Sequence, residues 1–271
     1  MDTHTALPTL FLSHGSPMYA LDAGTSGPAL RAFGDRLKAL QPRAVVVMSP
    51  HWMADQPRVM AAALPETWHD FGGFPEPLYR LQYPAPGSPE LAQQVAQRLQ
   101  AAGMEAPLDA RRPFDHGAWV PLMHLLPDAN VPVVQVALPA SAGPRDVYAM
   151  GQALRDLREQ GVVVVGSGSM THNLREFFGG RPELEAAPAP YVEAFSRWVE
   201  GVLQRGDLEA LLDYRAQAPH AVRAHPTDEH FLPIFFALGA AGWGEPGVAA
   251  PDYLTREVMY SFLSMDSFVL H

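Results

Sequence analysis

Residues 44–52 read AVVVMSPHW, an apolar run that ends in a histidine. A short apolar run bounded by turn residues is typical of a strand that is buried on both faces of a parallel sheet. Comparable runs occupy residues 9–13, 131–138 and 162–165, and amphipathic segments separate them. This alternation predicts an α/β fold in which residues 1–271 form a single domain, with a central mixed but mostly parallel sheet and helices on both faces.

The segments between these runs carry helical or loop signals. A long stretch rich in Gly, Pro and aromatic residues, 66–89, is expected to be an ordered loop that forms a wall of the functional site. Strand-like residues at 256–270 are expected to add a hairpin at the edge of the sheet. Helical spacing covers 28–40, 89–102, 114–126, 145–160, much of 191–214, and 231–238 with Thr227 or Asp228 as its N-cap.

Composition narrows the classes of function. The chain has 48% hydrophobic and 18% charged residues, which is enough apolar material for a large core. Its net charge of −10 argues against nucleic acid or an anionic membrane as a partner. No signal peptide is recognisable and no apolar run approaches the roughly 18 residues of a transmembrane helix, so a cytoplasmic monomer or small homo-oligomer is expected. Because the chain lacks cysteine, a metal would have to bind His, Asp or Glu.

Histidines follow three of the predicted strands. His14 directly follows the predicted strand at residues 9–13, and His51 lies at the end of the run at 44–52. His172 lies just beyond the turn after residues 162–165. The carboxyl ends of strands in an open α/β sheet face the ligand crevice, so these imidazoles are expected to converge, together with the His-rich turn at 225–230. Imidazole is a common ligand of Fe, Zn, Cu and Ni. The pattern predicts a metal site at the carboxyl ends of the strands.

Several short motifs occur in a fixed order from residue 10 to about residue 236. As a set they resemble the motif series of the class III extradiol ring-cleaving dioxygenases (the LigB-like superfamily), and they are most similar to the DOPA 4,5-dioxygenase branch. The motifs are LSHGSP at 12–17, SPHW at 49–52, HDFGGFP at 69–75, YPAPGSP at 83–89, FDHG at 114–117, GSG at 166–168 followed by His172-Asn173-Leu174, and Glu229-His230.

The resemblance implies an enzyme that opens the ring of a DOPA-like catechol with O₂ and gives a muconic semialdehyde-type product. It implies one non-haem Fe(II), whose place Zn(II) can take in purified protein. The implied metal ligands are His14, His51 and His230, with Glu229 competing for the third position because better-known members of the superfamily use two histidines and a carboxylate.

The resemblance also implies roles for residues around the metal. His172 is the expected acid–base residue, with an approach to the metal itself as a second role, and His116 is the expected partner of substrate or dioxygen. A histidine that titrates near neutrality can both accept and donate a proton, a role typically worth about 10²–10⁴ in rate. The residues expected to border the substrate are Ser16, Trp52, His69, Phe71 and His225, the last with no defined role.

Two other functions are compatible with the same residues. Three histidines and an open position also describe a water-activating zinc hydrolase. A non-catalytic, metal-containing interaction module is the second alternative. Neither alternative would consume oxygen when a catechol is added, whereas a dioxygenase would.

Overall fold

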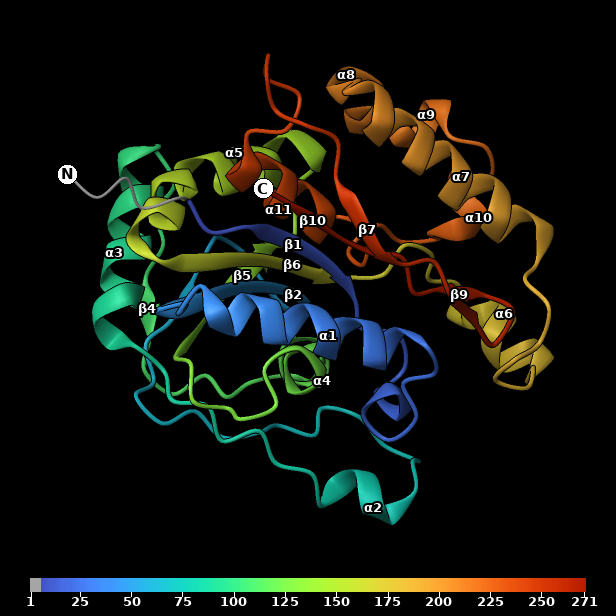
Figure 1. The fold of residues 1–271 in the computed structure, drawn as a ribbon, viewed down its shortest axis with the longest axis horizontal. Helices are drawn as coiled ribbons and strands as arrows, with labels where there is room; N and C mark the ends of the chain where they lie inside the picture. Colours follow the sequence, from blue (N-terminus) through green and yellow to red (C-terminus); the bar gives the residue numbers. More distant parts are fainter. Residues whose placement is uncertain (1–5) are drawn as a thin grey trace.

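The computed structural model describes residues 6–271, and an eight-stranded sheet runs through its centre (Figure 1). A separate two-stranded hairpin lies in the C-terminal region. The strands are β1 Thr9–Ser13, β2 Ala44–Ala54, β3 Val59–Met60, β4 Leu108–Asp109, β5 Val133–Pro139, β6 Val162–Gly168, β7 Asp252–Thr255, β8 Val258–Met259, β9 Leu263–Ser264 and β10 Ser267–Leu270.

The sheet is mixed but mostly parallel, as the sequence predicts. Its order is β4-β3-β5-β2-β6-β1-β10-β7. The four central strands β5, β2, β6 and β1 are parallel to one another. Antiparallel pairing occurs toward the edges, between β3 and β5, between β1 and β10, and between β10 and β7. The expectation of an edge hairpin within residues 256–270 is therefore wrong in detail. The edge strand β7 lies wholly before residue 256, and the hairpin formed within that range, β8-β9, is separate from the main sheet.

Helices cover both faces of this sheet, in agreement with the prediction. In Figure 1, α5 and α11 lie on one side of the strands and α1 and α4 on the other. The helices are η1 Pro17–Ala20, α1 Ser26–Ala39, α2 Glu76–Tyr79, α3 Pro89–Ala101, α4 His116–Leu125, α5 Pro144–Ala153, η2 Arg155–Gln160, α6 Leu174–Gly180, α7 Pro190–Arg205, α8 Leu208–Leu212, α9 Tyr214–Gln217, α10 Ala221–Ala224 and α11 Pro233–Ala241.

Alternation along β2 divides the interior into two cores. Val46 and Met48 belong to the core that contains α5 and α11, whereas Val45 and Val47 belong to the core that contains α1 and α4. Successive side chains of a strand point to opposite faces, so a strand covered on both faces has to be apolar at every position. This is the physical reason for the unbroken run at the start of β2.

Three element boundaries differ from the sequence-based expectation. Strand β2 continues past Ser49 to Ala54, with a register shift against β5 between Ser49 and Met53. The single helix expected at 145–160 is two elements, because the α-helix ends at Ala153 and a 3₁₀ segment follows. The last buried helix starts at Pro233 and not after Thr227 or Asp228, since proline suits the first helical turn, where an N–H has no partner.

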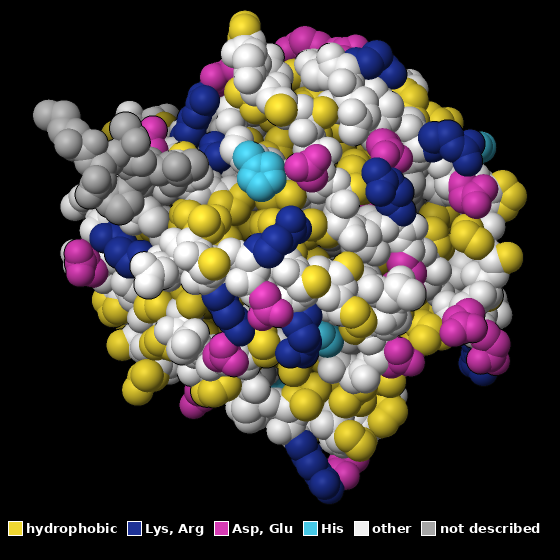
Figure 2. Space-filling view, viewed as in Figure 1, with side chains coloured by type: hydrophobic (Ala, Val, Ile, Leu, Met, Phe, Trp, Pro, Cys, Tyr) yellow, Lys and Arg dark blue, Asp and Glu magenta, His cyan; other side chains and the backbone are white. Residues whose placement is uncertain are grey.

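The molecular surface shown in Figure 2 carries mixed charge. On this face, Lys and Arg side chains are interspersed with Asp and Glu side chains and do not gather into one basic patch. Within residues 6–271, none of the helices combines the length and the apolar character needed to cross a membrane.

Candidate metal centre

His14 is held at the carboxyl end of β1. Its backbone N–H donates to the carbonyl of Gly168 on the neighbouring strand β6, over 2.9 Å, and its side chain is buried. The chain turns away immediately afterwards at Gly15, whose φ of +59° is a conformation that glycine adopts at little cost. The sequence His-Gly thus ends the strand and leaves the imidazole at the crevice.

His51 comes from the irregular end of β2. The preceding Pro50 has no N–H to donate to the ladder, and the register shift against β5 falls at this point. A local break of this kind redirects side chains. The Ser49 hydroxyl stabilises it, because Ser49 Oγ accepts from the His51 N–H over 3.2 Å and donates to Asp115 Oδ1 over 2.7 Å.

His116 is the first residue of α4. The helix is capped by Asp115, whose carboxylate accepts from the Ala118 N–H. Asp70, from the long 66–89 loop, accepts from both the backbone N–H and Nδ1 of His116, each over 2.9 Å. The same carboxylate lies 3.9 Å from His51 Nδ1. One loop carboxylate therefore holds the His116 ring by hydrogen bonds and lies near that of His51, and the two ring centroids are 3.9 Å apart.

His230 and His172 come from the two segments beyond β6 and before α11. The Ser169 N–H donates to the carbonyl of His230 over 2.8 Å, and the His172 N–H donates to the carbonyl of Ala224 over 2.9 Å. Gly168 permits this approach, since a Cβ there would lie 2.3 Å from the His230 carbonyl oxygen. The two rings stack, with centroids 3.5 Å apart.

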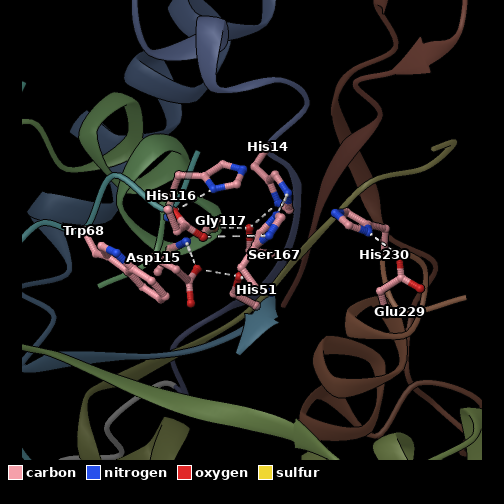
Figure 3. Close-up of polar contacts among 12 residues, drawn as sticks. His14, His51, Trp68, Asp115, His116, Gly117, Ser167, Glu229 and His230 are labelled. Atoms are coloured by element: carbon pink, nitrogen blue, oxygen red, sulfur yellow. Dashed lines mark hydrogen bonds and ion pairs between the residues drawn. The ribbon is translucent and has the colours of Figure 1, made fainter. Parts of the chain in front are cut away.

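The five histidines gather around one point, as Figure 3 shows for four of them. The Nε2 atoms of His14 and His51 are 3.1 Å apart, and the ring of His230 lies 5.5 Å from that of His14 and 5.0 Å from that of His51. Potential ligand atoms of His14, His51 and His116 lie within 4.8 Å of one another, and so do those of His172, Glu229 and His230.

Hydrogen bonds at Nδ1 of His14 and of His230 define which ring nitrogen is left unprotonated. The Ser167 hydroxyl uses its single proton to donate to the carbonyl of Gly117. Toward His14 Nδ1, which lies 3.0 Å away, it can therefore only accept. Glu229 Oε1 accepts from His230 Nδ1 over 2.9 Å. His14 and His230 therefore present unprotonated Nε2 atoms to the shared space. Metal-ligating histidines typically donate their other ring N–H in this way.

Burial keeps these imidazoles neutral. Burial, the largest cause, together with the neighbouring imidazoles lowers the pKa of His51 and of His172 to about 3. The same causes hold the pKa of His14 and of His230 well below the ordinary histidine value. Neutral imidazole is the form that binds metal.

The donor set fits a transition-metal cation. His230 Nε2 is buried and has no hydrogen-bond partner among the described residues. The facing Nε2 atoms of His14 and His51 are 3.1 Å apart, within reach of a hydrogen bond if one carries a proton, and a cation with Zn–N distances of about 2.0–2.1 Å also accommodates that separation. A buried polar atom without a partner is costly, and a metal ion would satisfy it.

Glu229 and His230 have different positions in this arrangement. In Figure 3 the His230 ring points toward His14 and His51, and Glu229 lies on the far side of that ring. Glu229 also accepts from the Thr227 hydroxyl, over 3.2 Å. Its carboxylate is thus engaged in orienting the imidazole.

A cavity of about 190 Å³ opens beside the histidines. Of the residues expected to border the substrate, Ser16 and Phe71 line it, and Trp52, His69 and His225 are not among its lining residues. The complete lining is Gly15, Ser16, Pro17, His51, Phe71, Phe74, His116, His172, Leu174, Phe177, Phe178, His230 and Leu263.

The three remaining residues have structural contacts. The guanidinium of Arg112 lies over the ring of Trp52, 4.8 Å from its centroid. His69 Nε2 donates to the carbonyl of Leu81 over 3.0 Å. His225 is fully buried, and its Nε2 donates to the carbonyl of Met170 over 2.9 Å.

Helix α6, which supplies Leu174, Phe177 and Phe178 to the cavity, was not among the helices predicted from the sequence. A signal was present, since Asn173 followed three residues later by Glu176 is a helix-start pattern. In the structure the Asn173 side chain accepts from the Glu176 N–H over 3.1 Å. The contact of Asp70 with two histidines had no comparable signal, because it joins segments far apart in the sequence.

The chain is similar to known proteins over most of its length. Residues 8–263 match the family model described as the catalytic LigB subunit of aromatic ring-opening dioxygenase. A protein named 4,5-DOPA dioxygenase extradiol from Beta vulgaris is 41% identical over 236 residues, 86% of this chain and 87% of the relative. One of the same name from Escherichia coli K12 is 37% identical over 251 residues, 89% and 88% of the two chains.

A solved structure is similar over the whole chain. The crystal structure of an uncharacterized protein from Escherichia coli K12 superposes with a TM-score of 0.75 at 30% sequence identity. The superposition covers 98% of this chain and 100% of that one. The similarity thus extends over the sheet, the helices and the loops that carry the histidines.

Proposed function

The chain belongs to the LigB family of aromatic ring-opening dioxygenases and is an extradiol dioxygenase, and from this premise we propose that it uses one Fe(II) ion to open a catechol ring with O₂ to a muconic semialdehyde-type product. The observation that carries the proposal is the convergence of buried and half-buried imidazoles, in two neighbouring groups, beside a cavity. Zn(II) is expected to bind the same imidazoles in protein purified without added iron.

The proposed metal ligands are His14, His51 and His230. Two features support this choice over Glu229. The Nε2 atom of His230 lacks a partner, and the Glu229 carboxylate is already bonded to His230 Nδ1. When bound, Fe(II) supplies a charged centre at which catechol and O₂ meet, and bringing reactants together in this way is worth about 7–11 kcal/mol in favourable cases.

His172 is proposed to move the catechol proton. It lines the cavity, and its only hydrogen bond given by the structure is through its backbone N–H, so the ring is not committed to a protein partner among the described residues. Burial lowers its pKa to about 3, so the ring is neutral and has a free lone pair, but it is a weak base without a bound substrate. A negatively charged catecholate beside the ring would raise this pKa and stabilise the proton there.

His116 is proposed to position the substrate. Asp70 binds its Nδ1 and its backbone N–H, which fixes the ring and leaves Nε2 as the nitrogen available for a substrate hydroxyl or for dioxygen. The apolar side chains Phe71, Phe74 and Phe177 line the same cavity. They exclude water from the reacting atoms, which strengthens the electrostatic interactions there.

The test is anaerobic reconstitution with Fe(II), followed by oxygen uptake and visible absorbance after addition of L-DOPA and a small panel of catechols. One O₂ consumed per catechol, with a yellow product, is the expected result. A filled iron site that consumes no oxygen with any catechol would contradict the proposal and would favour a zinc hydrolase or a binding protein.

A further inference from the structure

His51 differs from the other two proposed metal ligands in the way its ring is held. The Nδ1 atoms of His14 and of His230 each have a hydrogen-bond partner. His51 Nδ1 lies 3.9 Å from Asp70 Oδ2, which is too far for a hydrogen bond. The placement of this imidazole therefore depends on the backbone that carries it.

The backbone of His51 lies where the regular pairing of the sheet is interrupted. The register of β2 against β5 shifts between Ser49 and Met53, and residues 50–52 are paired with neither β5 nor β6. Two side chains take the place of the missing partners. Ser49 Oγ accepts from the His51 N–H over 3.2 Å, and Arg112 Nη2 donates to the His51 carbonyl over 3.1 Å.

Both of these side chains are held by the carboxylate of Asp115, which is fully buried and lies close to His51 (Figure 3). Its Oδ1 accepts from Ser49 Oγ over 2.7 Å, and its Oδ2 accepts from Arg112 Nη2 over 2.8 Å. The buried amide of Gln135 also donates to Oδ2. One carboxylate thus fixes the acceptor and the donor that hold the His51 backbone on both sides.

Capping of helix α4 does not account for this arrangement. As the N-cap residue, Asp115 uses only Oδ1, which accepts from the Ala118 N–H over 3.2 Å. Its Oδ2 binds Arg112, whose guanidinium also lies over the rings of Trp52 and Trp68, 4.8 and 5.0 Å from their centroids. A buried ion pair adds little net stability, because both groups lose their hydration. The effect of this pair in the structure is to fix the backbone of a proposed metal ligand.

Resting on the proposed function, in which His51 is a metal ligand, we propose that Asp115 and Arg112 are positioning residues that set the metal affinity of the site through His51. They act on its peptide groups, whereas the other two proposed ligands are oriented through Nδ1. Loss of a side chain that orients a metal ligand typically costs about 10–100-fold in metal affinity or activity. The proposal also gives a role to Trp52, which packs against the Arg112 guanidinium.

Arg112→Met removes the donor to the His51 carbonyl. Zn(II) affinity is measured by competition with a chromogenic chelator, without substrate, and should fall by about 10–100-fold. Arg158→Met is the matched control, because Arg158 is also buried and donates to a backbone carbonyl, that of Leu7, which precedes β1 at the end of the strand opposite the site. Equal losses in the two variants, or wild-type affinity in the Arg112 variant, would overturn the inference.

Ser49→Ala tests the other contact and disturbs the fold less, because it leaves the buried ion pair intact. It removes the acceptor of the His51 N–H, so Zn(II) affinity should again fall, by about tenfold. Ser26→Ala is its matched control, since this buried hydroxyl donates to the Ala23 carbonyl. A Ser49 variant that binds Zn(II) as tightly as this control would contradict the inference.

Asp115→Asn separates positioning from capping. Asparagine is as good an N-cap as aspartate, and its amide oxygen can still accept from Ser49 and from Ala118. Its NH₂ group cannot accept from Arg112, so the guanidinium is displaced from the position it now has. We expect Zn(II) affinity to fall by about 10–100-fold. Wild-type affinity would show that capping is the only role of this side chain, and the inference would fail.

His51→Ala distinguishes this inference from the proposed function. Full Zn(II) affinity in this variant would refute the proposed ligand set, and the inference with it. Loss of Zn(II) in this variant, together with wild-type affinity in both Arg112→Met and Ser49→Ala, would refute the inference alone. None of these measurements requires turnover, so they hold even if no catechol is oxidised.

Discussion

The imidazole rings of His172 and His230 are stacked, with their centroids 3.5 Å apart and their planes 9° from parallel. Two buried rings in this position cannot both carry a positive charge, since like charges at such a distance repel strongly. Only one ring is tied to a carboxylate, because Glu229 accepts from His230 Nδ1. This asymmetry supports the proposed roles, in which His230 binds the metal and His172 transfers the proton.

His172→Phe should keep the metal and lose turnover. A phenyl ring can stack on His230 in place of the imidazole, so the ligand geometry is preserved while the proton acceptor is removed. We expect kcat to fall by about 10²–10⁴. Metal content and oxygen uptake are measured on the same sample, and a variant with near-normal turnover would rule out the acid–base role.

His14→Ala should lose the metal. It removes one of two Nε2 atoms that lie 3.1 Å apart, and with it the bond from Nδ1 to Ser167. Metal analysis after dialysis against a weak chelator should give a content near zero. His271→Ala is the matched control, because this imidazole is exposed at the surface. Full metal occupancy in the His14 variant would show that the assigned ligand set is wrong.

Glu229→Gln distinguishes an orienting carboxylate from a ligand. If Glu229 only holds His230 Nδ1, the amide oxygen can still accept that hydrogen bond, and metal affinity should fall by about 10–100-fold. His230→Ala serves as the comparison and should abolish binding. Equal losses in the two variants, measured by competition with a chromogenic chelator, would make Glu229 the third ligand.

Gly117→Ala should displace His51. A Cβ at this position would lie 2.2 Å from Ser49 Oγ and 2.8 Å from His51 Cδ2. Such overpacking typically costs about 1–3 kcal/mol, so the free energy of unfolding and the metal affinity should both decrease. Gly179→Ala is the control, since a Cβ there meets nothing within 4 Å. Unchanged metal affinity in the Gly117 variant would indicate that His51 has freedom to move.

Acid should destabilise the metal-free protein partly through His225. Burial, the largest cause, lowers its pKa to about 3 although the bond to Met170 opposes this. In the unfolded chain this histidine takes up a proton near its ordinary pKa, whereas in the folded chain it does not until about pH 3. The free energy of unfolding is therefore highest above the ordinary histidine pKa. It decreases as the pH falls, by about 2 kcal/mol at pH 5 for this group.

His225→Gln tests this pH dependence. The glutamine amide can still donate to the Met170 carbonyl but has no group that titrates in this range. Urea unfolding of both proteins is measured between pH 5 and neutrality. The free energy of unfolding should depend less steeply on pH in the variant, because unfolding takes up as much as one proton fewer. The absolute stability is expected to change as well, so the slope is the measurement. Parallel slopes would contradict the shifted pKa.

Much of the fold could be predicted because its signals are local. An unbroken apolar run such as residues 44–48 is compatible with few positions other than the centre of a covered sheet, and the same holds for residues 162–165. Helix boundaries were less predictable. The helix expected after Asp228 begins at Pro233, because a turn closed by the Asp228 carbonyl comes first.

The sequence by itself determined the α/β class, the central buried strands and the histidines that follow them. These follow from hydrophobic periodicity and from the position of polar residues after apolar runs. Only the tertiary structure decided the contacts between those histidines and their partners. Asp70 lies 46 residues from His116 and Ser167 lies 153 residues from His14, yet each pair is hydrogen-bonded. Such pairings depend on how the sheet brings distant segments together, and no local pattern in the chain specifies them.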